Sequence, residues 1–139
     1  MNVRDYLDQL EVIEERIQSI QFDILQLKER ALIVTPSYSG DRVQSSGDLQ
    51  RTASVIDKWV DKEQEMNAEI DRLIDKRLEI SGMIRRLKEP NEIGVLQKLY
   101  IEKKSYEEIA DIYNRSVSWA KSIHGWALLN LQKELDAVN

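Results

Sequence analysis

The polar and cationic side chains between Lys104 and Gly125 are the part of this 139-residue chain best suited to contacting another molecule specifically. Lysine and arginine pair with phosphate or with guanine, whereas serine is a small and adaptable hydrogen-bonding group. On a helix, such side chains can read base edges in a groove of double-stranded DNA and hold its backbone. The candidate residues are Lys104, Ser105, Arg115, Ser116, Val117, Ser118, Lys121, Ser122 and Gly125.

Residues for catalysis are missing from the sequence. His124 is the only histidine and there is no cysteine to join it at a zinc site. The sequence contains no glycine-rich phosphate loop, nucleophile motif or paired-histidine zinc motif. We therefore expect no enzymatic activity, no metal and no cofactor.

Two short helices should position the candidate DNA-binding residues. Ser105 and Glu108 have the spacing of a capping box, which predicts a helix that begins just after Ser105. Asn114 tolerates a left-handed backbone, so the chain can reverse there. Ser116 then caps a last helix. Its predicted inward residues are Ala120, Ile123, Ala127, Leu131 and Leu135.

This spacing is the layout of a helix-turn-helix, although a short helix, an Asn turn and a Ser cap also occur in other helical bundles. In a helix-turn-helix, Ser118, Lys121 and Ser122 would face base edges. Gly125 would allow close approach of the DNA, or only helix packing. Phosphates would lie near Lys104, Arg115 and the capped helix starts at Ser105 and Ser116. Trp119 and Trp126 are seven residues apart, and we expect both to pack against the rest of this domain.

Upstream of this region, apolar residues recur at alternating spacings of three and four residues. This spacing predicts a coiled-coil helix over residues 3–34. The residues of this seam are Val3, Tyr6, Leu10, Ile13, Ile17, Ile20, Ile24, Leu27, Ala31 and Val34. A second seam predicts another long helix. It consists of Ile56, Trp59, Met66, Ile70, Leu73, Ile80, Ile84 and Leu87, interrupted by the polar residues Glu63 and Arg77.

The two long helices can fold back on each other as an antiparallel hairpin. Ile74 and Leu78 widen the second stripe, and this leaves apolar surface for another subunit. We therefore expect a homo-oligomer, most simply a dimer. The residues assigned to oligomerisation are Leu10, Ile13, Ile17, Ile20, Ile24, Leu27, Met66, Ile70, Leu73 and Ile80.

A polar loop over residues 35–52 should join the two long helices, because Pro36 stops the first and glycine and serine follow. Loops of this length are usually functional or disordered. Two interpretations stay open: a mobile tip, or a contact surface for a partner protein or phosphate. The contact residues would be Arg42, Gln44, Ser45 and Ser46.

The fold expected from these patterns is all-α: a hairpin domain over residues 1–89 and a helix-turn-helix domain over residues 90–139. Charged residues make up 32% of the chain and only two prolines occur, which suits long solvated helices. The net charge is −5, and no segment is strongly basic, so a broad electrostatic grip on nucleic acid is not predicted. The absence of cysteine and of a long apolar run indicates a cytoplasmic protein that does not enter a membrane.

The stretch "SYEEIADIYNRSVSWAKSIHGWALLNL" resembles the fourth conserved region of bacterial sigma factors, which recognises the −35 promoter element. The whole chain resembles small phage and prophage regulators of the ArpU/RinA-like kind, with "SGDRVQSSGD", "YIEKKSYEEIA" and "IHGWAL" as the specific parts. This resemblance implies a transcriptional activator of phage late, packaging or lysis genes that works with host RNA polymerase. Such sequences often carry glycine where Lys103 and Asn114 stand, and more bases in the last helix.

Two other functions fit the same patterns. Small terminase subunits of phage packaging also join a helix-turn-helix to an oligomerising helical region, and a ring of many subunits would favour that function. A coiled-coil adaptor that binds only protein, such as RNA polymerase, is the other possibility. The weak basic charge supports the adaptor.

Overall fold

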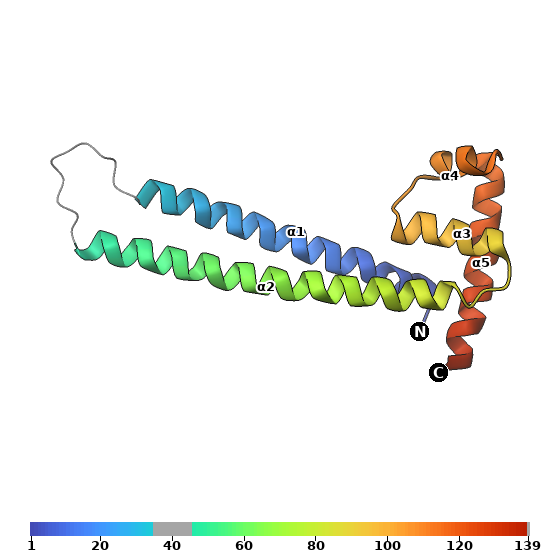
Figure 1. Ribbon diagram of the computed structural model, residues 1–139, viewed down its shortest axis with the longest axis horizontal. Coiled ribbons are helices and arrows are strands. Elements are labelled where there is room, and N and C mark those ends of the chain that lie inside the picture. The colour runs from blue at the N-terminus through green and yellow to red at the C-terminus, as the bar shows by residue number, and fades with distance from the viewer. Residues whose placement is uncertain (35–45, 139) are drawn as a thin grey trace. The chain divides into compact units, whose positions relative to one another are not determined.

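Every element in the computed structural model, which describes residues 1–34 and 46–138, is a helix (Figure 1). No strand occurs in this part of the chain, so the predicted all-α class is confirmed. The helices are α1 (Val3–Val34), α2 (Ser46–Ile84), α3 (Pro90–Leu96), the π-helix η1 (Gln97–Ile101), α4 (Tyr106–Tyr113) and α5 (Val117–Val138). The bounds predicted for the first helix agree with those of α1. None of the described helices combines the length and apolar character needed to cross a membrane.

The chain divides into two compact units. The hairpin unit comprises Ile13–Arg72, and the end unit comprises Met1–Val12 together with Leu73–Asn139. Helices α1 and α2 each contribute residues to both units. The boundary expected between residues 89 and 90 therefore falls inside the end unit.

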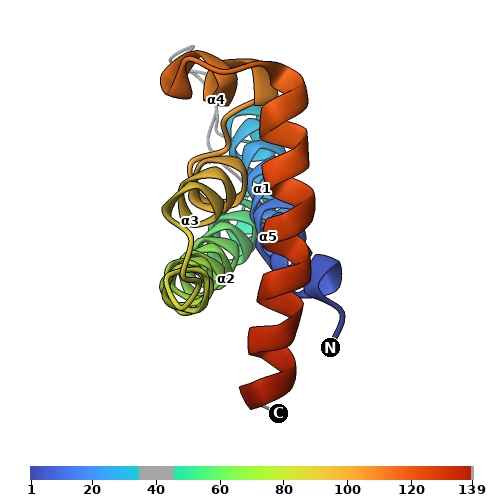
Figure 2. The same ribbon diagram turned by 90° about the vertical axis from the view of Figure 1, so that its right-hand side faces the viewer.

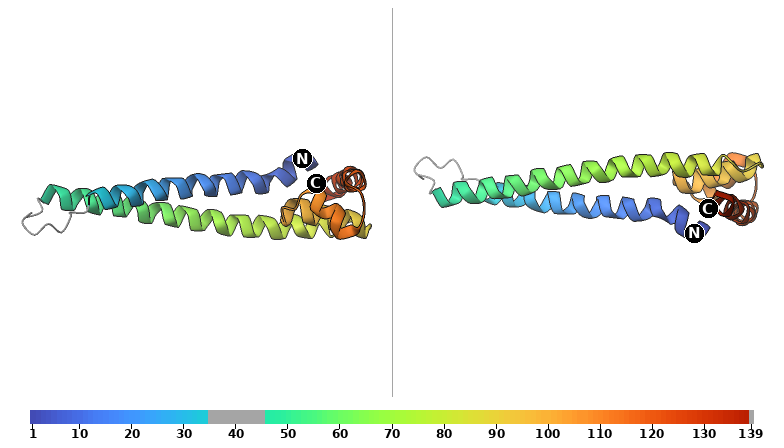
Figure 3. Two further views of the ribbon diagram at one scale, coloured as in Figure 1. Left: turned by 90° about the horizontal axis from the view of Figure 1, so that it is seen from above. Right: turned by 90° about the horizontal axis from the view of Figure 1, so that it is seen from below.

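In the hairpin unit, residues 13–34 of α1 and 46–72 of α2 run side by side in opposite directions (Figures 1 and 3). Two ion pairs show the antiparallel order: Arg16 Nη1 lies 3.2 Å from Glu69 Oε1, and Asp23 Oδ2 lies 3.4 Å from Lys62 Nζ. Apolar residues of the predicted first seam are buried between them, because neither helix can bury its stripe alone. These residues are Ile13, Ile17, Ile20, Ile24 and Ala31.

Two predictions for α2 were wrong in detail. The helix begins at Ser46, so the second part of the predicted loop, residues 46–52, is helical. Serine and aspartate are favoured in the first turn of a helix, and no proline follows to break it. The first residue of the seam was also wrong, since Val55 is 7% exposed and Ile56 is 43% exposed. Later residues of the predicted seam are buried as expected: Leu73, Ile80, Ile84 and Leu87. Of the proposed loop contacts, Arg42, Gln44 and Ser45 lie outside the described residues.

The end unit is built around α5, against which α3 and α4 pack (Figure 2). Val95, Ile109 and Ala120 form one buried cluster within it. The remaining parts of α1 and α2 are joined to the C-terminal helices by hydrogen bonds. Gln97 Nε2 donates to Ser81 Oγ at 3.0 Å, and the Val3 backbone N–H donates to Gln132 Oε1 at 2.7 Å.

Replacement of Ile17 by Asp should lower the free energy of unfolding by at least about 3 kcal/mol, because a carboxylate would be buried without a partner. Chemical denaturation followed by circular dichroism measures this change. The matched control is Gln18→Asp, one residue along the same helix and exposed to solvent. Equal effects of the two substitutions would contradict the assignment of Ile17 to the hairpin core.

Candidate nucleic-acid interface

Helix α4 begins at a capped serine, as the sequence predicted. The Glu108 backbone N–H donates to Ser105 Oγ at 3.2 Å, and Ser105 has the extended backbone of an N-cap residue. Glu107 and Glu108 occupy the first turn, where negative charge is favoured by the helix dipole. The cap therefore sets where α4 starts relative to the preceding chain.

The turn between α4 and α5 is set by Asn114, whose backbone is left-handed at φ 54° and ψ 46°. The Arg115 N–H bonds back to the Ala110 carbonyl at 2.9 Å and so closes the end of α4. Two residues on, Ser116 Oγ accepts a hydrogen bond from the Trp119 N–H at 3.0 Å. The predicted turn and second cap are thus both confirmed.

Small residues allow α4 to approach its neighbours closely. Ala110 of α4 and Ala120 of α5 are both buried, and Ile109 is fully buried beside them. Gly94 of α3 leaves room for the Tyr113 hydroxyl, since a β-carbon at residue 94 would overlap it. These contacts hold α4 firmly against the first turns of α5.

Four of the candidate base-reading residues lie on one exposed side of α5. At about 100° of rotation per residue, Ser118, Lys121, Ser122 and Gly125 occupy a sector of about 100°. All four are exposed. On the opposite side, Ala120, Ala127 and Leu131 are fully buried. The structure therefore brings the candidate readers together on the surface of one helix.

The candidate base reader Lys121 and the proposed phosphate-binding residues beside it make contacts of their own. The Arg115 guanidinium is 5.7 Å from the Trp119 ring centre, and Lys121 Nζ is 5.7 Å from that of Tyr106. Both cations remain exposed, while Lys104 and Val117 are half-buried. The hydroxyl oxygens of Ser105 and Ser116 accept the cap hydrogen bonds. Their O–H groups could still donate a hydrogen bond to a phosphate.

The two tryptophans differ, although the sequence predicted that both pack inward. Trp119 is half-buried and its ring centre lies 5.3 Å from that of Tyr113. Trp126 is 63% exposed, and Leu129 beside it is also exposed. Helix α4 has only eight residues and its last residue, Tyr113, meets Trp119. At its other end, Tyr106 meets His124, so α4 does not reach Trp126 and the prediction for that residue was wrong.

His124 is hydrogen-bonded through both ring nitrogens, which sequence reasoning did not anticipate. Nε2 lies 2.7 Å from the Tyr100 hydroxyl and Nδ1 lies 2.9 Å from the Tyr106 hydroxyl. Burial, assisted by the positive charge of Arg4, lowers the pKa of His124. Burial also raises the pKa of Tyr100 to about 12. The neutral imidazole thus joins η1 and the start of α4 to α5.

The residues assigned to oligomerisation are largely enclosed within a single chain. Leu27, Met66 and Ile70 are half-buried, and the remaining residues of the set are buried: Leu10, Ile13, Ile17, Ile20, Ile24, Leu73 and Ile80. A second copy cannot reach the buried residues while the helices remain paired. Among the described residues, no group of three histidine, aspartate or glutamate side chains is placed to hold a metal ion.

Lys103 and Asn114 are the non-glycine residues with positive φ in the part of the chain that the structure describes. A left-handed backbone costs a side-chain-bearing residue roughly 1 kcal/mol, and asparagine tolerates it better than lysine. The backbone conformation therefore explains why glycine suits both positions.

Lys103→Gly should raise the free energy of unfolding by about 1 kcal/mol, because glycine adopts the left-handed backbone without strain. Lys104→Gly is the control, since glycine at a residue without positive φ increases only the entropy of the unfolded chain. Urea denaturation of both variants tests the difference. A loss of stability in Lys103→Gly as large as that in Lys104→Gly would refute the prediction.

Acidification should destabilise the protein through His124. Because its pKa is lowered on folding, the unfolded chain binds a proton more readily, and stability falls as the pH drops through about 6.5. The urea midpoint should therefore decrease more steeply between about pH 7.5 and 5.5 in the unmodified protein than in His124→Gln. Parallel pH profiles would show that His124 does not titrate differently in the two states.

Comparison with known proteins adds a family. Residues 32–131 match a family model described as "Protein of unknown function (DUF1492)". The match includes the sequence from the end of α1 to α5 and therefore contains the whole candidate interface. No curated protein and no solved structure matches the chain. Since the matched segment covers well over half of the sequence, the chain belongs to the DUF1492 family.

Proposed function

We propose that this protein is a sequence-specific, DNA-binding transcription regulator of the ArpU/RinA-like phage kind. In this proposal, α4, the Asn114 turn and α5 form a sigma-like helix-turn-helix, with α5 as the recognition helix in the major groove. The paired α1 and α2 act as a coiled-coil region through which the protein forms a homo-oligomer, most simply a dimer. It would activate late, packaging or lysis genes in the cytoplasm of a bacterial host.

The observation that supports this proposal best is the grouping of Ser118, Lys121, Ser122 and Gly125 on the exposed side of α5. This side begins at the capped N-terminus of α5, where backbone N–H groups and the helix dipole favour a phosphate. Arg115 and Lys121 provide cations at the same end. A helix whose exposed side carries two serines, one lysine and one glycine has no bulky side chain there that would keep it out of a groove.

Electrostatics sets the conditions under which such binding would work. The net charge of −5 opposes general attraction to DNA, and few cations surround the candidate face. One helix-turn-helix would therefore bind weakly. Two copies on adjacent half-sites, or additional contacts with RNA polymerase, would supply the missing affinity through effective concentration. No metal, cofactor or catalytic group enters this proposal.

A second candidate function is an adaptor that binds RNA polymerase without reading DNA. Exposed Trp126 and Leu129 favour it, because tryptophan is enriched in protein interfaces and is seldom left in solvent. In that case the polar side of α5 would be ordinary solvated surface. The two functions differ in whether the purified protein alone selects a DNA sequence.

Selection of bound genomic fragments by the purified full-length protein, at two salt concentrations, tests the main proposal. Enrichment of one short site upstream of a gene block at both concentrations is the expected result. Enrichment at a start site of DNA packaging would indicate a small-terminase-like recognition subunit instead. Failure to enrich any site would overturn the regulator proposal and favour the adaptor.

Lys121→Ala should weaken binding to the selected site by about 1–3 kcal/mol if Lys121 contacts a base. Its effect on unrelated DNA should be much smaller. Lys133→Ala is the control, because Lys133 is an exposed lysine on the same helix and lies about 120° away from Lys121 around its axis. Fluorescence anisotropy measures both affinities, and circular dichroism verifies the fold. Equal affinities for the two variants would remove Lys121 from the interface.

A further inference from the structure

Three cationic side chains meet in one groove on the hairpin unit. The groove has a volume of about 340 Å³, and we call it the cationic groove. None of the residues that line it is acidic, although the whole chain has a net charge of −5. The lining residues are Leu27, Arg30, Arg51, Ser54, Val55 and Lys58.

The spacing of these residues along α1 and α2 explains why they meet. On α2, Arg51 and Lys58 are seven residues apart and lie within about 20° of each other around the helix axis. Ser54 lies between them, within a sector of about 100° that contains all the lining residues of α2. On α1, Arg30 is three residues from Leu27 and shares its side of the helix. The grouping therefore follows from the helices themselves and not from the rotamer of one side chain.

The floor of the cationic groove is apolar. Val55 is buried and Leu27 is half-buried, whereas Arg30, Arg51 and Lys58 are exposed. A low-dielectric wall beneath charges of one sign concentrates their electric field in the groove. An anion is therefore attracted there more strongly than to the same cations scattered over the surface.

Neighbouring carboxylates do not neutralise the cationic groove. Glu29 and Asp57 directly precede Arg30 and Lys58, but each lies about 100° away around its helix, and neither lines the groove. Neither Arg30 nor Lys58 forms an ion pair with a residue that the structure describes. Their charges are available to an anion from outside the chain.

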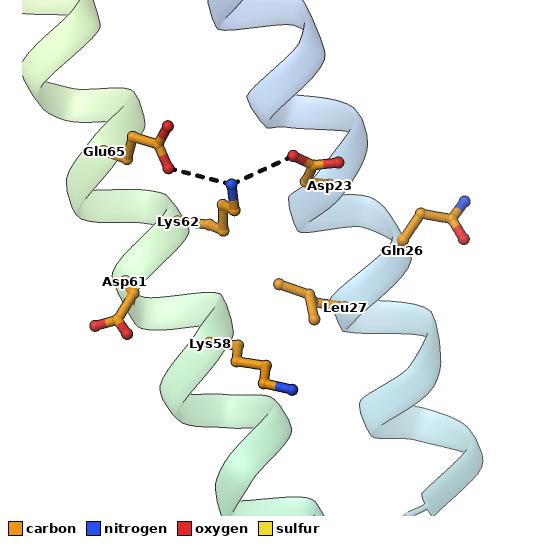
Figure 4. Close-up of a pocket in the computed structure, with 7 residues that line it drawn as sticks. All are labelled: Asp23, Gln26, Leu27, Lys58, Asp61, Lys62 and Glu65. Carbon is orange, nitrogen blue, oxygen red and sulfur yellow. Dashed lines mark ion pairs between the residues drawn. The ribbon is translucent and has the colours of Figure 1, made fainter.

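A second groove on the hairpin unit provides a comparison (Figure 4). It has a volume of about 520 Å³ and shares Leu27 and Lys58 with the cationic groove. Within it, Lys62 Nζ lies 3.4 Å from Asp23 Oδ2 and 3.2 Å from Glu65 Oε2. Figure 4 shows no ion pair between Lys58 and the other residues drawn. Lys62 is thus neutralised within the chain, whereas Lys58 is not.

The side chains of the cationic groove favour a phosphate group as the ligand. Arginine donates two parallel hydrogen bonds to phosphate oxygens, and lysine adds a compact positive charge. The Ser54 hydroxyl is a further hydrogen-bond donor. A phosphate monoester carries a charge of about −1.5 to −2 and three acceptor oxygens. It therefore matches three cations better than a carboxylate, which carries a single negative charge.

The surroundings favour a small molecule over a nucleic-acid strand. Asp23, Asp61 and Glu65 line the second groove, which adjoins the cationic groove at Lys58. These carboxylates would repel a polyanion that continued along the two helices. A volume of about 340 Å³ is in the range of small-molecule sites, about 300–1,000 Å³.

We propose that the cationic groove binds the phosphate groups of a small molecule. Arg30, Arg51 and Lys58 supply the charge, Ser54 donates a hydrogen bond, and the apolar floor accommodates an attached organic group. The groove lies entirely within the hairpin unit, so this inference does not depend on DNA recognition by α5.

Isothermal titration calorimetry of the full-length protein with inorganic pyrophosphate and with ADP tests the inference. At about 0.1 M salt, charges more than about 10 Å apart are largely screened, so only local cations should matter. The unmodified protein should bind both probes but not adenosine, which has no phosphate. Tighter binding of ADP than of pyrophosphate would indicate an organic phosphate as the ligand, and the reverse order an inorganic one.

Substitutions locate the binding site. Arg30→Gln and Lys58→Gln should each weaken binding of both probes at least about fivefold, because each removes a charged hydrogen-bond donor. Arg72→Gln is the matched control, since it removes the same charge from an exposed residue of α2 that lines neither groove. Arg72 is about 21 Å along the helix from Lys58, and its replacement should leave both affinities unchanged.

Further measurements separate this inference from the proposed function. Lys121→Ala should bind pyrophosphate as the unmodified protein does, and Arg30→Gln should select the same genomic fragments. Three results would overturn the inference: neither probe binds, both affinities persist in Arg30→Gln and Lys58→Gln, or a short single-stranded oligonucleotide displaces both probes from these residues and binds more tightly.

Discussion

The contact of α4 with α5 around Ala120 is the interaction on which the candidate interface depends. A helix of eight residues is not stable by itself in water, because nucleation costs more than so few hydrogen bonds return. It persists because Ile109 and Ala110 are buried and because α4 packs against α5. The alanines allow the close approach, and the Asn114 turn then determines which side of α5 remains exposed.

The two sides of helix α5 have different roles. Its buried side carries small and apolar residues that pack inside the end unit, while its exposed side carries the candidate readers. His124 lies at the border between them and is bonded to Tyr100 and Tyr106. Because these bonds come from η1 and from the first residue of α4, they restrain α5 at the level of Lys121 and Gly125. Recognition by α5 would therefore rely on a rigid frame rather than on high charge.

The hairpin unit follows a different constraint. Two paired helices bury only the apolar side chains of their shared seam. Apolar side chains outside this seam remain exposed to solvent unless another chain covers them. The identity of the seam residue matters here. Since Val55 rather than Ile56 turns inward, Ile56 lies on the exposed side of α2 with Leu49 and Val60. Near the start of α2, the burial of Val55 in place of Ile56 thus puts one residue of the expected internal seam on the surface.

Local patterns were sufficient for much of this protein. The spacing of three and four residues between apolar side chains predicted α1 from residue 3 to 34. Ser105, Asn114 and Ser116 marked the caps and the turn correctly, because a cap or a turn depends on the residue itself and on the few backbone groups next to it. The inward residues Ala120, Ala127, Leu131 and Leu135 followed from the same periodicity. These features depend on interactions within one or two turns of helix, so the sequence alone determined them.

The start of α2 at Ser46, the exposure of Trp126, the partners of His124 and the choice between Val55 and Ile56 could not be obtained in this way. Trp119 and Trp126 have the same helical phase, and only the length and placement of α4 decide which one is covered. Val55 and Ile56 are both β-branched and adjacent, so either can join the seam until α1 packs against α2. Which apolar residues are buried is a property of surfaces that meet across the fold, and only the tertiary structure decided it.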